Sequence, residues 1–415
     1  MQKLITWIDD RFPLIKVWEE HMAKYYAPRN FNIWYFFGSL ALLVLVIQIV
    51  TGIFLTMHYK PDVNTAFASV EYIMRDVPWG WLMRYLHSTG ASMFFIIVYL
   101  HMFRGMLYGS YREPRELVWL IGMLIFVALM AESFMGYLLP WGNMSYWGAQ
   151  VIISLFGAIP LVGDALTEWI RGDFVVGDAT LNRFFSFHVI MVPLILAGLV
   201  YVHIVALHKV GSNNPDGIEI KNNKRPDGIP VDGIPFHPYY TVKDIFGTVV
   251  FLFLFFLIVF YAPELGGWFL EKDNFTPANI LQTPPEIVPL WYFTPYYSIL
   301  RAVTWEWLPL GAKLWGVIAM GMSLGFFFLL PWLDRSPVKS IRYRGWMYKT
   351  ALTLFVVSFI VMGYLGTKNP THVDLLWFSN KTWSQIGLFV YFAFFILMPI
   401  YTTLDKTKPV PERVR

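Results

Sequence analysis

The sequence contains no cysteine and few charged residues. Only 14% of its 415 residues are Asp, Glu, Lys or Arg, whereas 56% are hydrophobic and 19% aromatic; a soluble domain has about 25% charged residues. The absence of cysteine excludes disulfides, thiolate-held iron–sulfur or zinc centres, and haem attached through a C-x-x-C-H motif. The formal net charge of +4 is too small and too scattered to indicate binding to nucleic acid. We therefore expect a membrane protein in which histidine or carboxylate holds any metal.

Long segments without charge predict eight transmembrane helices. A spanning helix needs about 20 mostly apolar residues. The segments of this kind are 30–59, 85–103, 117–137, 184–208, 245–263, 314–333, 350–367 and 382–404. A ninth apolar segment, 141–163, is interrupted by several glycines and by Pro160, so we interpret it as short helices at the membrane interface. The fold class expected is an all-α integral membrane protein with short interfacial helices.

The distribution of basic residues predicts the orientation in the membrane. With eight spans and the N-terminus inside, the inner segments hold most of the 32 lysines and arginines, as the positive-inside rule requires. Both termini are therefore expected in the cytoplasm. The first 29 residues alternate charged with aromatic side chains and lack the apolar core of a signal peptide, which indicates an amphipathic interfacial segment.

Histidines inside two of the predicted spans are the main functional signal. His87 and His101 are 14 residues apart in the second span, and His188 and His203 are 15 apart in the fourth. At about 100° and 1.5 Å per residue, each pair lies near one helix face, about 21 Å apart along the axis. Both helices run inward, so His87 should meet His188 near the outer side, and His101 should meet His203 near the inner side.

Two stacked pairs of imidazoles predict two non-covalent b-type haems, because neutral imidazole is a regular axial ligand of haem iron. For a single buried histidine, a hydrogen-bonded structural role is the alternative, but two pairs at matched depth favour haem. Arg84 and Arg104, each three residues from a ligand candidate, suit haem propionates or, alternatively, reach toward the membrane surface.

Glycines recur with the same 14-residue spacing in the first and third spans: Gly38 and Gly52, and Gly122 and Gly136. Such glycines would let a flat macrocycle approach the backbone closely. The alternative is that they only permit close helix packing.

Four long segments carry a resemblance to a known family. They are MRYLHSTGASMFFIIVYLHMFRGMLYGSYREPRE, GYLLPWGNMSYWGAQVI, RFFSFHVIMVPLILAGLVYVHIVALHKVGSNNPDG and PFHPYYTVKDIFG. In this order they resemble the cytochrome b subunit of respiratory cytochrome bc complexes of the bacterial type (quinol:cytochrome c oxidoreductase, Complex III). The resemblance implies that the first four of eight helices form a dihaem bundle. It also implies a low-potential haem at His87 and His188 and a high-potential haem at His101 and His203.

This interpretation divides the chain into five parts. They are an interfacial N-terminus (1–29), a dihaem bundle (30–210) with interfacial loop helices (141–180), a cytoplasmic loop (211–244), a C-terminal four-helix region (245–404) with a quinol-site loop (264–312), and a cytoplasmic tail (405–415).

The resemblance also implies two quinone sites, for ubiquinone or another quinone. For the outer, quinol-oxidising site it points to Phe134, Tyr137, Gly148, Pro289, Trp291, Tyr292 and Tyr297, and aromatic walls do suit a quinone headgroup. For the inner, quinone-reducing site it points to His208, Ser212, Lys243 and Asp244. An imidazole and a carboxylate across a quinone can exchange protons with the cytoplasm, although Asp244 can also be an ordinary acid near a helix start.

The sequence departs from the family pattern at two places. The His188 to His203 spacing is 15 where the mitochondrial form has 14, which we expect to change haem tilt at most. The tetrad usually written Pro-Glu-Trp-Tyr has Leu290 in place of glutamate, and leucine cannot accept the quinol proton. Two acids are candidates to replace it: Glu132, the only acid between residues 117 and 163, and Glu286 in the same loop as Leu290. Their alternatives are a protonated structural acid and a solvated loop acid, respectively.

The predicted function is quinol oxidation at the outer site and quinone reduction at the inner site, coupled to proton translocation. The implied partners are a Rieske iron–sulfur protein, a membrane-anchored c-type cytochrome, membrane lipid and a second copy of the complex, in a bacterial inner membrane. A dihaem membrane anchor of a dehydrogenase is one alternative, but it needs no loop such as PPEIVPLWYF. A proton-coupled transporter is another, but it needs no matched histidine pairs.

Overall fold

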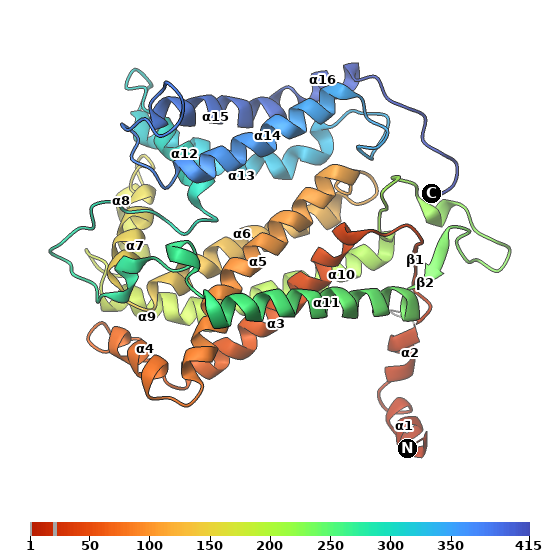
Figure 1. The fold of residues 1–415 in the computed structure, drawn as a ribbon, viewed down its shortest axis with the longest axis horizontal. Coiled ribbons are helices and arrows are strands. Elements are labelled where there is room, and N and C mark those ends of the chain that lie inside the picture. Colours follow the sequence, from red (N-terminus) through yellow and green to blue (C-terminus); the bar gives the residue numbers. More distant parts are fainter. Residues whose placement is uncertain (1, 20–22) are drawn as a thin grey trace.

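The computed structural model describes residues 2–19 and 23–415 and is mostly helical (Figure 1). Its α-helices are α1 (Gln2–Asp9), α2 (Leu14–Trp18), α3 (Phe36–Thr56), α4 (Ala66–Arg75), α5 (Gly80–Tyr108), α6 (Glu116–Leu138), α7 (Asn143–Phe156), α8 (Gly163–Arg171), α9 (Asp178–Ser186), α10 (Val192–Val210), α11 (Phe236–Tyr261), α12 (Thr294–Ala302), α13 (Ala312–Leu333), α14 (Trp346–Leu365), α15 (Asn380–Ile396) and α16 (Met398–Leu404). A π-helical turn, η3 (Phe187–Met191), joins α9 to α10. Of the predicted N-terminal segment 1–29, residues 1 and 20–22 lie outside the described residues.

The membrane-spanning helices agree with the predicted fold class. Within the described residues, 7 helices are long and apolar enough to span a membrane, and the bent pair α15 and α16 brings the total to 8. The last span, predicted as continuous over 382–404, is instead bent by 60° between Ile396 and Met398. Pro399, at the start of α16, explains the break, because proline cannot supply the N–H that a continuous helix needs.

The segment predicted to be interfacial contains no spanning helix. Helix α7 has 14 residues, which gives a length of about 21 Å, well short of a bilayer core. Together with α4, α8 and α9 it lies at one end of the long helices, and the small β1 (Tyr26–Pro28) and β2 (Gly233–Pro235) ladder lies at the other end (Figure 1). These two groups cap the bundle at its two ends, which are the predicted outer end and the predicted inner end, respectively.

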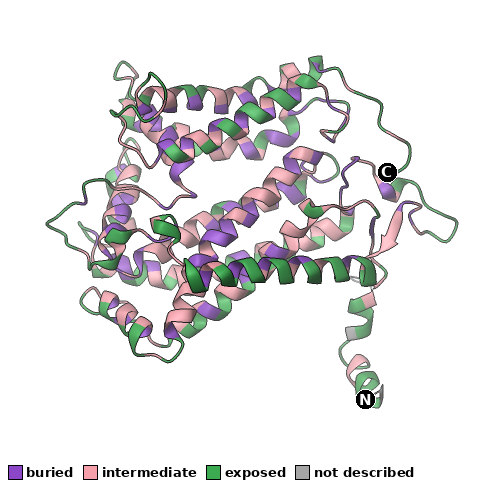
Figure 2. Cartoon of the chain, viewed as in Figure 1, coloured by how far each residue is buried: buried purple, intermediate pink, exposed green. Residues whose placement is uncertain are grey.

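The helices pack as two neighbouring groups around a shared core. Helix α3 packs on α5, α6 packs on α10, and α11 lies against α3 and α5, while α12 to α15 form the second group. Buried side chains from both groups, such as Phe95 and Phe355, belong to one apolar cluster. Figure 2 shows the exposed residues of α11 along its outward side, and these include Phe253 and Phe260. An exposed apolar face of this kind is what contact with lipid requires.

Ion pairs fix the inner end of the molecule. The carboxylate of Asp232 accepts hydrogen bonds from Arg413 at 2.9 and 2.8 Å, and these bonds hold the pKa of Asp232 below its usual value. The C-terminal tail is thereby held against the loop 211–244. Deeper in the protein, Arg344 donates to Asp334, and both side chains are fully buried. Ion pairs therefore connect several segments at this end of the bundle.

Candidate haem and quinone sites

The outer pair of histidines faces across the bundle as predicted. His87 on α5 and His188 on η3 have ring centroids 6.1 Å apart and rings at 88° to one another. A histidine nitrogen binds a transition metal at about 2 Å and its ring centre lies roughly 1 Å further away, so two imidazoles on opposite sides of one iron have centroids about 6 Å apart. The gap between His87 and His188 therefore fits one haem iron.

The inner pair has the same arrangement. The ring centroids of His101 and His203 are 6.4 Å apart, which again fits one iron between them. The Nδ1 atoms of both rings are buried and have no hydrogen-bond partner among the described residues. The structure thus brings together the two predicted pairs, one above the other along α5.

Glycines on the helices without ligands make room for the imidazoles themselves. A Cβ atom placed on each glycine would lie close to Cε1 of one histidine. The distances are 3.3 Å for Gly38 and His101, 3.2 Å for Gly52 and His87, 3.2 Å for Gly122 and His203, and 2.4 Å for Gly136 and His188. The sequence predicted close approach of a macrocycle to these glycines, whereas the structure shows that the ligand rings lie against them.

Hydrogen bonds orient the two outer imidazoles. Nδ1 of His188 lies 2.9 Å from the backbone oxygen of Glu132, and Nδ1 of His87 lies 3.0 Å from Oγ1 of Thr51. The Thr51 hydroxyl already donates to the backbone oxygen of Ile47, so in both contacts the imidazole is the donor. A proton on Nδ1 leaves Nε2 free to bind iron, which is the usual role of such supporting contacts.

The π-helical turn explains the extra residue in the fourth span. A π turn accommodates one more residue than the α-helix around it, and η3 (Phe187–Met191) contains His188. The spacing of 15 between His188 and His203 therefore gives the same angular position as a spacing of 14 in a regular helix. Both histidines can face the α5 ligands without a change of helix direction.

The two arginines lie where charged haem substituents would need them. No described carboxylate forms an ion pair with Arg84 or Arg104, and Nε of Arg104 is buried without a hydrogen-bond partner among the described residues. The guanidinium of Arg104 lies over the ring of Tyr35 at 4.9 Å and 3.4 Å from the Ser110 hydroxyl. A buried guanidinium nitrogen without a partner, as in Arg104, fits an anionic ligand such as a haem propionate.

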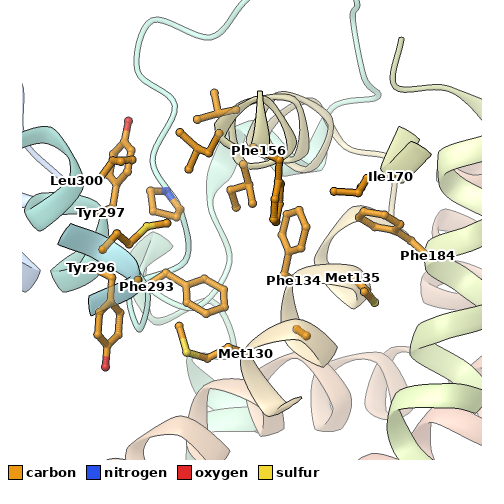
Figure 3. Close-up of a pocket in the computed structure, with 18 of the residues that line it drawn as sticks. Met130, Phe134, Met135, Phe156, Ile170, Phe184, Phe293, Tyr296, Tyr297 and Leu300 are labelled. Carbon is orange, nitrogen blue, oxygen red and sulfur yellow. The ribbon is translucent and has the colours of Figure 1, made fainter. Parts of the chain in front are cut away.

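A cavity of about 660 Å³ lies beside the outer histidine pair. Among the predicted outer-site residues, Phe134, Gly148, Pro289 and Tyr297 line it. Figure 3 shows Phe134 and Phe184 on one side of the space and Tyr297 on the other. Its aromatic and aliphatic walls suit a planar apolar headgroup with an isoprenoid tail.

Three of the seven predicted outer-site residues, Tyr137, Trp291 and Tyr292, are not among those that line this cavity. Tyr292 stacks on Phe95 with centroids 3.8 Å apart, and its hydroxyl pairs with that of Ser133. The indole nitrogen of Trp291 donates to Ser92 at 3.1 Å. Through these contacts Trp291 and Tyr292 hold the loop against α5 and α6.

The two acids proposed from the sequence as proton acceptors also lie outside the cavity lining. Oε1 of Glu132 is 3.0 Å from Nδ1 of His188, so its carboxylate supports the outer ligand. Glu286 is exposed and interacts electrostatically with Arg301. The roles proposed for these two acids from the sequence stay predictions.

The inner-site residues form two groups. His208 stacks on Tyr25 with centroids 4.5 Å apart, and the Tyr25 hydroxyl lies 2.9 Å from that of Ser212. Asp244 has a side-chain hydrogen bond with Ser39. The ammonium of Lys243 lies 5.1 Å from the centre of the Tyr240 ring. The ring of Phe236 lies between those of Tyr25 and Tyr240, with centroids 6.1 and 6.0 Å away.

Sequence reasoning missed three residues of these sites: Thr51, Tyr25 and Glu271. Thr51 and Tyr25 contact predicted residues, as described above. Glu271 accepts a hydrogen bond from Tyr137. Its only signal in the sequence is an acid directly after the apolar run Trp268–Leu270.

Paired histidines at two depths of a spanning helical bundle define the class of membrane-embedded b-type cytochromes. Two family descriptions match the chain: Cytochrome b/b6/petB over residues 22–211 and Cytochrome b(C-terminal)/b6/petD over residues 277–392. The chain belongs to the cytochrome b family. It is the haem-binding cytochrome b of a bc-type respiratory complex, and so the core catalytic subunit of a quinol:cytochrome c oxidoreductase.

Individual relatives agree with this assignment. Cytochrome b of Allochromatium vinosum is 61% identical over 414 residues, which cover 99% of this chain and 98% of that protein. Cytochrome b of Rhodospirillum rubrum is 48% identical, with 99% and 96% covered. A solved structure described as hyperthermophilic respiratory Complex III superposes with a TM-score of 0.86 at 39% identity, covering 96% of this chain and 99% of that one.

Proposed function

We propose that the cavity beside His188 is the quinol-oxidation site of this cytochrome b. The observation that carries the proposal is that the cavity and the outer haem position use the same helical segments. Phe187 and Met135 line the cavity, and the next residues in the chain are the iron-ligand candidate His188 and the glycine that it lies against, Gly136. A quinol in the cavity would therefore lie against the same helical segments that hold the outer haem position. Such proximity is what rapid electron transfer to that haem requires.

The two histidine pairs would hold two b haems, and these supply one-electron transfer when bound. His87 and His188 would hold the low-potential haem on the outer side, and His101 and His203 would hold the high-potential haem on the inner side. The protein orients the ligands through Thr51 and the Glu132 backbone. Inward movement of one electron across the membrane opposes the potential by about 2.3 kcal/mol per 100 mV if the whole field is crossed.

The inner end would bind quinone between its two groups of polar residues. His208 and Ser212 lie on one side with Tyr25, and Lys243 and Asp244 lie on α11. An imidazole and a carboxylate placed in this way can deliver two protons to a reduced quinone. The quinone taken at both sites is ubiquinone or a related isoprenoid quinone.

The partners follow from this function. One electron from each quinol goes to a Rieske iron–sulfur protein at the outer side and on to a membrane-anchored c-type cytochrome, in a complex that forms a homodimer. The excess of basic residues in the inner segments supports cytoplasmic termini. The membrane is the bacterial inner membrane.

Filling the cavity tests the assignment of the oxidation site. Gly148 lines the cavity, so Gly148→Phe should abolish reduction of the outer haem by quinol while both haem spectra stay unchanged. Gly198→Phe is the matched control, because Gly198 is exposed on α10 and has nothing within 4 Å of its Cβ position. Oxidation of quinol at the wild-type rate by the Gly148→Phe complex would reject the site.

A further inference from the structure

The segment that carries Glu271 is fixed against the turn after α6. The backbone N–H of Asn143 donates to the Thr276 oxygen at 2.9 Å, and that of Ala278 donates to the Trp141 oxygen at 3.0 Å. These bonds cross between residues 141–143 and 276–278, far apart in the sequence. Glu271, at the start of the short η6 helix (Lys272–Phe275), is therefore held in a defined position at the outer end of the bundle.

Tyr137 connects this carboxylate to the proposed quinol cavity. Its hydroxyl donates to Oε2 of Glu271 at 3.0 Å. Tyr137 itself is not among the residues that line the cavity, but its Cε1 lies 3.6 Å from the Cβ position of Gly148, which is. A phenol in this place can accept a proton from one side and donate its own proton to the other.

The surroundings of Glu271 suit a proton acceptor near neutral pH. Burial raises the pKa of its carboxyl to about 7, and the nearby charge of Asp273 acts in the same direction. The hydrogen bonds from Tyr137 and from its own backbone N–H act in the opposite direction. Tyr292 is the other titratable group that interacts with it. The best general base has a pKa close to the working pH.

The other outer acids considered for this role lack this connection. Glu132 lies against His188, and Glu286 is exposed near Arg301. Leu290, which stands where the family usually has glutamate, is buried and has no proton to exchange. Among the acids compared, Glu271 is thus the one that is hydrogen-bonded to Tyr137, whose ring lies next to Gly148 of the cavity lining.

We propose that Glu271, acting through Tyr137, accepts the proton that quinol loses at the outer cavity. This inference rests on the proposed oxidation site. The quinol O–H bond breaks and its proton passes to Oη of Tyr137, while the Tyr137 proton passes to Oε2 of Glu271. The carboxylate becomes a carboxylic acid, and the electrons leave to the acceptors of the oxidoreductase reaction. Glu271 is only partly buried and is followed by the exposed Lys272 and Asp273, so it can release the proton to the outer aqueous side.

The test is the rate of outer-haem reduction by quinol between about pH 5.5 and pH 9, in membranes that contain the whole complex. In the wild type the rate rises with pH as Glu271 loses its proton. Glu271→Gln should lower the rate at about pH 8 by roughly a hundredfold and remove this pH dependence, because a general base contributes about 10² to 10⁴ in rate. Tyr137→Phe should have the same effect, and Glu271→Asp should retain a pH-dependent rate.

Two further variants separate this role from a structural one. Asp273→Asn should keep the maximum rate but move the rise toward lower pH, because it removes a neighbouring negative charge. Glu71→Gln changes a partly exposed carboxylate on α4 that pairs with Arg75, and it should behave as wild type. Haem content, and reduction of the inner haem from the inner site, check that every variant is assembled.

The outcomes distinguish this inference from the assignment of the cavity. A Glu271→Gln complex with both haems, the wild-type rate and an unshifted pH profile would overturn the role of Glu271. That role is also wrong if Glu286→Gln removes the pH dependence and Glu271→Gln does not. If Gly148→Phe leaves quinol oxidation intact, the cavity itself is wrong, whatever the Glu271 variants show.

Discussion

The contact between Gly136 and His188 gives the sharpest prediction about the haem sites. A methyl group at Gly136 would lie 2.4 Å from Cε1 and 2.8 Å from Nε2 of His188, where ordinary contacts begin at 3.4 Å. The imidazole would have to move by about 3.4 − 2.4 = 1.0 Å, away from the position that faces His87. Overpacking of this size costs about 1–3 kcal/mol, so Gly136→Ala should weaken retention of the outer haem by roughly ten- to hundredfold.

The matched comparison is Gly52→Ala on the other side of the same haem. Its added methyl would lie 3.2 Å from Cε1 of His87, so a shift of about 3.4 − 3.2 = 0.2 Å is enough and the haem should be retained. Haem content per protein and a redox titration of membranes measure both variants, with Gly198→Ala as an open-space control. Full outer haem in Gly136→Ala, or greater loss in Gly52→Ala, would refute the reasoning.

Three other predictions concern the ligands, the buried ion pair and the inner site. His87→Asn should remove the outer spectral component and His203→Asn the inner one; loss of the same component in both variants would contradict the pairing. Asp334→Asn should destabilise the protein by about 3–5 kcal/mol, because it leaves the buried Arg344 without its partner. Thermal unfolding of the solubilised protein measures this, and replacing both residues with leucine should cost less. Asp244→Asn should slow reoxidation of the inner haem but not its first reduction; unchanged reoxidation from about pH 6 to pH 9 would count against that role.

The number of spans was predictable from the sequence because it depends on local composition. Twenty apolar residues without charge leave few alternatives to a membrane helix. Most observed helices end close to the predicted bounds, but α11 begins at Phe236, well before the predicted start at residue 245. The bend after Ile396 was missed because hydropathy carries no information about direction. Pro399 was the visible signal, since proline inside an apolar helix marks a break or a kink.

The histidine pairing was also predictable, because helical periodicity fixes which side chains share a face. The extra residue before His203 was not, because a single added residue can produce either a tilted ligand or a π turn. Only the tertiary structure places that residue in η3, where His188 itself lies.

The position of side chains in the outer loop was beyond sequence reasoning. The motif identified Trp291 and Tyr292 as part of the outer site, but it could not show that both point into the protein core. Glu271 was missed because its partner, Tyr137, is 134 residues away in the sequence. No local period connects a loop acid to a helix that distant, so only the folded chain brings them together.

Each imidazole packs against a glycine on a different helix, and this arrangement has a consequence for how the protein is assembled in the membrane. Each iron position depends on side chains from two helices and on open backbone from two more, which for the outer position are α5 and η3 with α3 and α6. No single helical hairpin leaving the insertion machinery can therefore hold haem. Because a ligand that binds only the assembled bundle stabilises it by mass action, haem supply should set how much newly inserted chain escapes degradation by membrane proteases.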